Sequence, residues 1–160
     1  MSTVDDYASG RILKDVKKTE QMIDDFERTK DTTIWNALKE KSKDSKHYHF
    51  LADMTELEAL IRNAKKIAIG PRVCLEVHQD CKQPMESVFL EELADALVNV
   101  GKARKATKKE ANLLLKKGLE KGYPHVVSIV SDKPLELCNT CSECCVLWKR
   151  EKLGIESIRK

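Results

Sequence analysis

Val126-Val-Ser-Ile-Val130 and Leu135-Glu-Leu137 are two short β-prone runs, separated by the turn-forming sequence Ser131-Asp-Lys-Pro134. Apolar runs of this length with a turn signal between them predict a β-hairpin. The second run leads directly into Cys138-Asn-Thr-Cys141-Ser-Glu-Cys144-Cys145. We therefore expect a hairpin that delivers the chain into a dense cysteine loop.

Two helices are predicted before this hairpin. The first has its apolar face between Phe89 and Val100, and Pro84 fits its first turn, where the missing N–H costs nothing. The second begins at the capping box Thr107-Lys-Lys-Glu110. Helix, turn, helix and hairpin in this order are typical of a winged helix, with Thr107–Lys121 as the recognition helix and Val126–Leu137 as the wing.

The remainder of the chain is predicted to be helical as well. Residues 1–46 form an N-terminal helical hairpin or extension, in which Asp31 caps the second helix and the charged stretch Lys39–Lys46 is a linker. Residues 47–160 form a helical domain with one β-hairpin and the C-terminal metal-cluster loop. The expected fold class is α+β, predominantly helical.

The first N-terminal helix carries one narrow apolar stripe at helical spacing. This stripe either packs on the protein's own core or serves as a docking surface, for example in a homodimer. Its members are Ile12, Val16, Thr19, Ile23 and Phe26.

Composition restricts the classes of function. The chain has 160 residues, a formal net charge of +3 and six cysteines. No apolar run approaches the roughly 20 residues that span a bilayer, and the acidic N-terminus lacks the apolar stretch of a signal peptide. We therefore expect a cytoplasmic protein without a membrane segment. In a reducing compartment, clustered cysteines hold metals or perform redox chemistry more often than they form structural disulfides.

The cysteine run has the pattern C-x2-C-x2-C-C. Two-residue gaps let a chain wrap around a compact inorganic core, and C-x2-C-x2-C supplies three corners of a [4Fe–4S] cube in bacterial-type ferredoxin sites. The intervening residues are small or polar, so their backbone amides can donate hydrogen bonds to cluster sulfurs. The pattern predicts an iron–sulfur cluster.

The segment from about Val100 to Trp148 resembles the ferredoxin-type [4Fe–4S] proteins of anaerobic bacteria and archaea. The resemblance is carried by the capped helix, by Gly122-Tyr-Pro-His125, and by the hairpin that enters the cysteine run. It implies that Cys138, Cys141 and Cys144 ligate the cluster. The chain lacks the C-x3-C-P ending and has a single cysteine run, so a two-cluster ferredoxin is excluded.

Three candidates remain for the fourth ligand. Cys145 is adjacent to Cys144, and neighbouring residues rarely reach the same cube. Cys74 and Cys81 are remote in sequence, as a fourth ligand usually is. A cluster with only three protein ligands would leave one iron open to substrate or solvent.

Zinc is the alternative metal, because thiolates also form its tetrahedral sites. A zinc ribbon, however, has two C-x2-C knuckles separated by a longer loop, which this run lacks. A second site at Cys74-x3-His78-x2-Cys81 has only three local ligands, and buried free cysteines are common. No phosphate loop, nucleophile elbow or H-E-x-x-H motif is present, so electron transfer or sensing is favoured over catalysis by side chains.

Lysine and arginine are concentrated between Lys102 and Lys121. This basic segment either solvates one face of a helix, contacts DNA phosphates or docks an acidic redox protein. Three functions follow: a one-cluster, ferredoxin-like electron carrier of anaerobic metabolism, an iron–sulfur-dependent winged-helix transcription regulator, or a zinc-stabilised interaction module.

Overall fold

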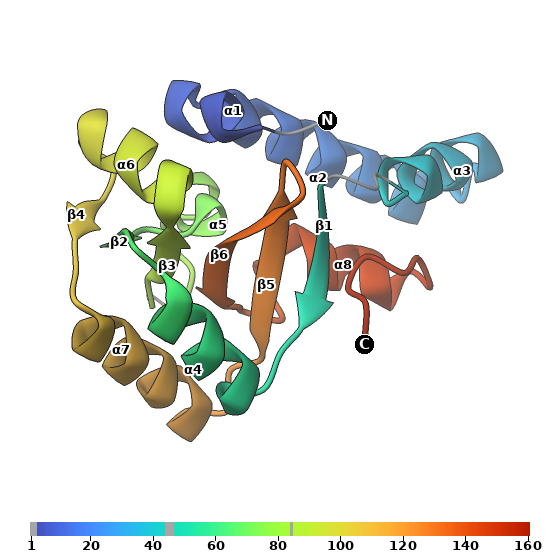
Figure 1. Ribbon diagram of the computed structural model, residues 1–160. Helices are drawn as coiled ribbons and strands as arrows, with labels where there is room; N and C mark the ends of the chain where they lie inside the picture. The colour runs from blue at the N-terminus through green and yellow to red at the C-terminus, as the bar shows by residue number, and fades with distance from the viewer. Residues whose placement is uncertain (1–2, 44–46, 84) are drawn as a thin grey trace.

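A sheet with the strand order β1-β5-β6-β3-β2-β4 forms the framework of the computed structural model, which describes residues 3–43, 47–83 and 85–160 (Figure 1). All neighbouring strands are antiparallel. The strands are β1 (His47–Leu51), β2 (Ile67–Gly70), β3 (Ser87–Leu90), β4 (Arg104–Lys105), β5 (His125–Val130) and β6 (Lys133–Asn139).

Helices cover both faces of this sheet. They are α1 (Val4–Ser9), α2 (Arg11–Thr29), α3 (Thr32–Lys41), α4 (Met54–Asn63), α5 (Val73–Val77), α6 (Glu91–Asn99), α7 (Lys108–Glu120) and α8 (Val146–Lys152). Capping boxes at Asp53 and Thr107 begin α4 and α7, because each side chain accepts a hydrogen bond from the backbone N–H three residues later.

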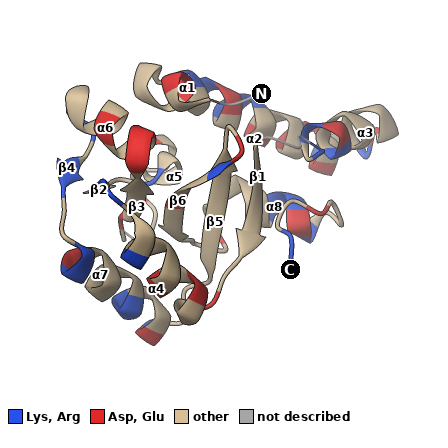
Figure 2. Ribbon diagram, viewed as in Figure 1, with Lys and Arg blue, Asp and Glu red and all other residues tan. Residues whose placement is uncertain are grey.

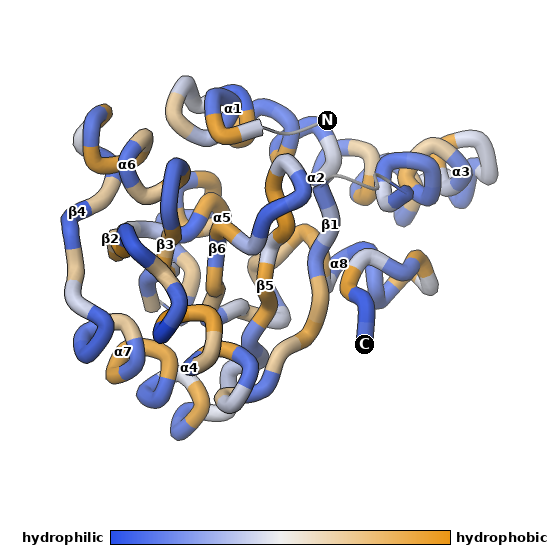
Figure 3. Tube along the Cα trace, viewed as in Figure 1, coloured by the Kyte–Doolittle hydropathy of each residue, from blue (hydrophilic) through white to orange (hydrophobic). Residues whose placement is uncertain are grey.

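One face of the sheet is covered by α4 and α7. Leu57 and Ile61 of α4 and Leu115 of α7 pack against Val127 and Leu137 of the central strands. The hydrophobic parts of β5 and of these two helices are orange in Figure 3. Strand alternation explains this core, because every second residue of β5 points to the same face.

The N-terminal helices lie on the opposite face. Tyr7 and Ile12 pack with Leu93 of α6 and Val130 of β5. Farther along, Ile23 of α2 forms a buried cluster with Leu38 of α3 and Ile155 of the C-terminal tail. The apolar stripe of α2 is therefore packed on the protein's own core.

The mixed α+β class and the β5–β6 hairpin are confirmed. Ser131 and Asp132 connect the two strands with φ values of 51° and 66°, as a two-residue hairpin turn with positive φ at both positions requires. The hairpin lies in the middle of the sheet, because β1 pairs with β5 and β3 pairs with β6. The winged-helix arrangement is not confirmed, since a wing projects from its sheet.

Two expected boundaries differ from the structure. The helix expected from Pro84 begins at Glu91, and Ser87–Leu90 forms β3 instead; Pro84 itself lies outside the described residues. A strand buried on both faces is apolar without alternation, so its run resembles a buried helix. The expected linker Lys39–Lys46 begins as the last turn of α3, which ends at Lys41, and residues 44–46 lie outside the described part of the chain.

No helix within the described residues has the length and apolar character needed to cross a membrane.

Candidate metal centre

Three cysteines from two distant segments form a group. The sulfur atoms of Cys81, Cys141 and Cys144 all lie within 4.8 Å of one another. Cys81 and Cys144 are paired as a disulfide, with Cα atoms 6.4 Å apart. Cys141 is buried, whereas Cys81 and Cys144 are partly exposed. We call these residues the three-cysteine group.

Buried hydrogen bonds bring the two segments together. Arg72 Nη1 donates to the carbonyl oxygen of Asn139 at 2.9 Å, and Arg72 Nη2 donates to the carbonyl oxygen of Gln83. Gln83 Nε2 in turn donates to the carbonyl oxygens of Asn139 and Thr140, at 3.2 and 2.9 Å. The segment from Arg72 to Gln83 is thereby fixed to the start of the cysteine loop, and it carries Cys81.

The loop is also held from its other side. The amide and hydroxyl of Thr140 both donate to the carbonyl oxygen of Pro124, and Trp148 Nε1 donates to Thr140 Oγ1 at 2.9 Å. Within the loop, the Cys145 amide donates to the Cys141 carbonyl at 3.0 Å. Because these bonds hold both ends of the loop, Cys141 and Cys144 are presented in a fixed geometry.

His125 lies against the strand that enters the loop. His125 Nε2 is 2.8 Å from Asn139 Oδ1, while Asn139 Nδ2 donates to the carbonyls of Glu86 and Leu114. Asn139 packs so closely on Gly118 of α7 that a Cβ atom at position 118 would overlap its side chain.

The predicted ligands are divided between two places. Cys141 and Cys144 belong to the three-cysteine group, together with Cys81, one of the candidate remote ligands. Cys138 and Cys145 instead line a cavity on the other side of the loop, and Cys74 lies there too. Cys138 belongs to β6, and the alternation of side chains turns it to the same sheet face as Glu136.

Burial keeps the cysteines of the cavity in the thiol form. It raises the pKa of Cys74 to about 12 and also raises the pKa values of Cys138 and Cys145, with Arg72 opposing each shift. In the metal-free chain these three thiols therefore lie in an apolar setting, as buried free cysteines commonly do.

Arg72 provides positive charge beside the three-cysteine group. Its side chain is 1% exposed, and Nη2 lies 3.9 Å from Cys81 Sγ. A buried cation stabilises nearby thiolates and anionic metal–thiolate centres. Nothing in the sequence near Arg72 marked this role, because the partners of Arg72 at Asn139 and Gln83 are set by the tertiary structure.

The expected second site at Cys74-x3-His78-x2-Cys81 is not assembled. His78 Nε2 lies 2.7 Å from Glu20 Oε2 of α2, and Lys149 contacts the same carboxylate oxygen at 3.5 Å. Cys74 faces the cavity while Cys81 belongs to the three-cysteine group. His78 is thus part of a polar cluster with Glu20 and Lys149.

The basic segment lies on β4 and α7, on the other side of the sheet from α2 (Figure 2). Part of its charge is balanced within the chain, because Lys116 Nζ lies 3.7 Å from Glu58 and Arg104 Nη1 lies 3.1 Å from Glu86. Figure 2 shows acidic residues on α4 and α7 among the basic ones. This face is therefore of mixed charge.

In comparisons with known protein families, curated proteins and solved structures, nothing matches this chain.

Proposed function

We propose that this protein binds one iron–sulfur cluster through Cys81, Cys141 and Cys144 and acts in electron transfer. The observation that carries the proposal is the convergence of Cys81 with two cysteines of the C-x2-C-x2-C-C run, although 63 positions separate it from Cys144. Ferredoxin-type clusters also combine closely spaced cysteines with a cysteine from another part of the chain, with four ligands in all.

The surroundings of the three-cysteine group support a redox role. Cys81 and Cys144 are partly exposed, so an electron has a short route between the centre and a partner protein. Arg72 and the backbone around Asn139 and Thr140 supply positive charge and hydrogen bonds, which tune the potential of such centres. With three protein ligands, the fourth coordination position is left for an external ligand.

A single zinc ion is the second candidate. Zinc–sulfur bonds of about 2.3 Å place the thiolates of a tetrahedral site about 3.8 Å apart, and the three sulfur atoms lie within 4.8 Å of one another. A cube holds its thiolates farther apart, because each one is bound to a different iron. Either metal would require reduction of the Cys81–Cys144 disulfide, since a disulfide provides no thiolate ligands, and the cluster would also require the sulfur atoms to move farther apart.

We propose a redox protein as the partner rather than DNA. The β5–β6 hairpin is enclosed between β1 and β3, so it is not available as a wing for the duplex. Acidic residues interrupt the positive surface of α7, which weakens phosphate binding.

The test is analysis of iron, zinc and acid-labile sulfide in protein purified without oxygen, with visible spectra before and after dithionite. Iron with equivalent sulfide and an absorption that dithionite bleaches would support the cluster. Stoichiometric zinc without sulfide would replace it with a structural metal site. Absence of both metals after reconstitution of the reduced protein with iron, sulfide and zinc would overturn the metal centre altogether.

A further inference from the structure

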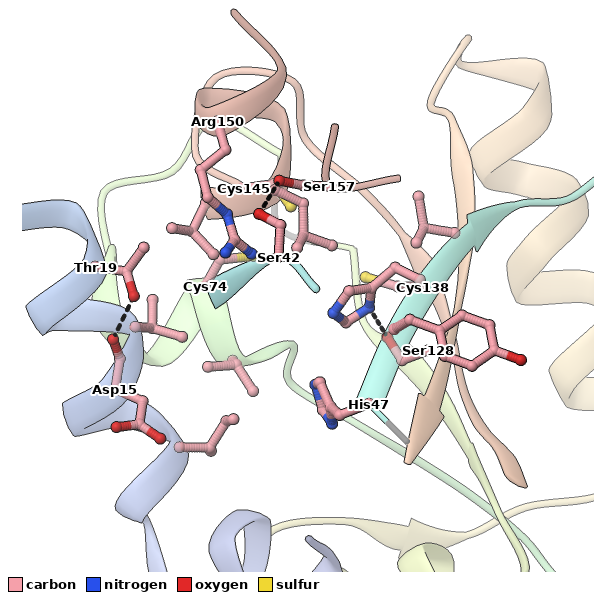
Figure 4. Close-up of a pocket in the computed structure, with 18 of the residues that line it drawn as sticks. Asp15, Thr19, Ser42, His47, Cys74, Ser128, Cys138, Cys145, Arg150 and Ser157 are labelled. Carbon is pink, nitrogen blue, oxygen red and sulfur yellow. Dashed lines mark hydrogen bonds between the residues drawn. The ribbon is translucent and has the colours of Figure 1, made fainter. Parts of the chain in front are cut away.

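A cavity of about 540 Å³ lies between the N-terminal helices, α8 and one face of the sheet (Figure 4). Its size is within the range of pockets that hold small organic molecules. The strands contribute His49, Ser128 and Glu136, and α5 contributes Cys74. The cavity is distinct from the three-cysteine group, none of whose members lines it.

Arg150 is the unusual member of this lining. Figure 4 shows its side chain extending from α8 into the cavity, toward Cys74 and Ser42. The residue is 9% exposed, and its Nε atom is buried without a hydrogen-bond partner. Across residues 3–43, 47–83 and 85–160, no hydrogen bond or ion pair reaches the Arg150 side chain.

Arg72, the other buried arginine of the lining, shows which contacts the Arg150 side chain lacks. The Nε atom of Arg72 is likewise buried without a partner, but both of its terminal nitrogens donate to backbone carbonyls. Arg150 is a planar donor fork of fixed charge that has no such acceptors. The buried atom of this group is Nε, and the terminal nitrogens have no acceptor in the described chain. A cation at a largely buried site is stabilised by hydrogen-bond acceptors or a counter-charge, which a ligand in the cavity can supply.

Carboxylates of the cavity do not supply that acceptor. Asp15, Glu40 and Glu136 are its described acidic lining residues, and none forms an ion pair with Arg150. Burial raises the pKa of Glu136 to about 7, which disfavours its charged form, while Asp15 and Glu40 are exposed. Burial also holds the pKa of His49 well below its usual value, so this imidazole adds no charge.

We propose that this cavity binds a small organic monocarboxylate, whose carboxylate group is held by the guanidinium of Arg150. A planar fork matches a carboxylate in two parallel hydrogen bonds. The apolar body of the ligand would lie against Ile12, Val16, Val73 and Leu147, which line the same cavity. Lys41 also lines the cavity and forms no ion pair among the described residues, but it is exposed, whereas Arg150 is buried; the carboxylate is therefore assigned to Arg150.

This site does not depend on the identity of the metal centre. It nevertheless adjoins that centre, because Cys145 of the lining directly follows Cys144 of the three-cysteine group. A carboxylate bound here would therefore lie beside the cysteine loop.

Ligand-detected NMR titrations of the full chain test the proposal with acetate, pentanoate and phenylacetate, each compared with its neutral amide, and with inorganic phosphate. We expect saturable binding of pentanoate or phenylacetate at least about tenfold tighter than that of the matching amide, since a lost charged hydrogen-bond pair costs at least this factor. Arg150→Met should remove this preference. Lys152→Met should keep it, because Lys152 is an exposed cation on the same helix.

Equal binding of acid and amide, or preference retained in Arg150→Met, would overturn the proposal. Binding of phosphate without carboxylates, or no binding of any probe, would overturn it too. If Arg150→Met does not fold, the acid–amide comparison in the unaltered chain decides alone.

Discussion

Arg72 Nη1 lies 2.9 Å from the carbonyl oxygen of Asn139, and this buried hydrogen bond joins the two segments that carry the three-cysteine group. The bond spans 67 positions of sequence. It fixes the start of the cysteine loop to the segment that ends near Gln83. The assembly of the candidate metal centre therefore depends on a residue that is not itself a metal ligand.

Replacing Arg72 with Met should destabilise the fold and impair the metal centre together. The substitution removes the Arg72 donor of the buried Gln83 carbonyl and one of the two donors of the Asn139 carbonyl, at a cost of about 3 kcal/mol. Urea denaturation and metal content measure the two effects. Arg104→Met is the control, since Arg104 is an exposed partner of Glu86 and should change stability by less than about 1 kcal/mol. Full metal content in Arg72→Met would contradict the role assigned to this arginine.

Cys81→Ser should lower metal content at least about tenfold, as loss of a ligand exceeds the effect of losing a supporting residue. Cys74→Ser is the matched control, because Cys74 belongs to the same segment but faces the cavity. Cys138→Ser distinguishes the ligand set found in the structure from the set that the sequence pattern implies. This variant should retain metal if the three-cysteine group is the metal site. Loss of metal in Cys138→Ser, with retention in Cys81→Ser, would favour the ligand set that the resemblance implies.

The metal-free chain should exist in an oxidised state, with the Cys81–Cys144 disulfide formed, and in a reduced state, with that disulfide opened. Oxidised, unmetallated protein is expected to show four reactive thiols after denaturation, and reduced protein six, because the Cys81–Cys144 pair withdraws two of them. Thiol titration measures the numbers. The oxidised form should not take up metal until it is reduced, since a disulfide provides no thiolate ligands. Equal metal uptake by both forms would show that Cys81 and Cys144 are not ligands.

Gly118→Ala should destabilise the protein by about 2 kcal/mol, although alanine is normally the better helix former. The added Cβ atom would overlap the Asn139 side chain and disturb its contact with His125. Chemical denaturation measures the change, and Lys117→Ala on the exposed side of α7 is the control. A stabilised Gly118→Ala variant would mean that Asn139 moves aside without cost.

Because of Glu136, the free energy of unfolding should fall as pH rises. Burial raises the pKa of this carboxyl from 4.5 to about 7 in the folded chain, so the folded state binds the proton more tightly than the unfolded state. The contribution is present below about pH 4.5 and is lost as pH rises toward 7, by at most about 3 kcal/mol. The free energy of unfolding is measured for the unaltered chain and for Glu136→Gln between pH 5 and 8. The difference between the two chains isolates the contribution of Glu136, because the contributions of the other titrating groups cancel. A difference that is independent of pH would contradict the shifted pKa.

Local elements were the most predictable part of the fold. The capping box at Thr107, the stripe of α2 and the β5–β6 hairpin depend on interactions between residues a few positions apart. β3 was mistaken for the start of a helix, because a strand buried on both faces has no alternation to identify it. The place of the hairpin within the sheet could not be read locally, since it depends on pairing with β1 and β3.

The candidate site was predicted in part. The sequence indicated the cysteine run and offered Cys81 among the remote ligands, but it could not choose between Cys81, Cys74 and Cys145. Arg72, Gln83 and Gly118 were missed. An isolated glycine inside a predicted helix is a weak signal of close packing, whereas the other two residues carry no local signal.

The sequence by itself determined the capped helix α7, the apolar stripe of α2, the hairpin and the spacing of the cysteines, because capping, side-chain periodicity and turn chemistry act over a few residues. The tertiary structure alone decided which cysteines meet. Cys138 faces the cavity with Glu136, because it is still within β6, where side chains alternate between the faces of the sheet. Cys81 lies beside Cys141 and Cys144 because long-range hydrogen bonds hold its segment against the cysteine loop. The bond from Arg72 to Asn139, for example, connects residues 67 positions apart. Packing between elements that are distant in the sequence also places Arg150 in the cavity, where its side chain has no partner in the described chain.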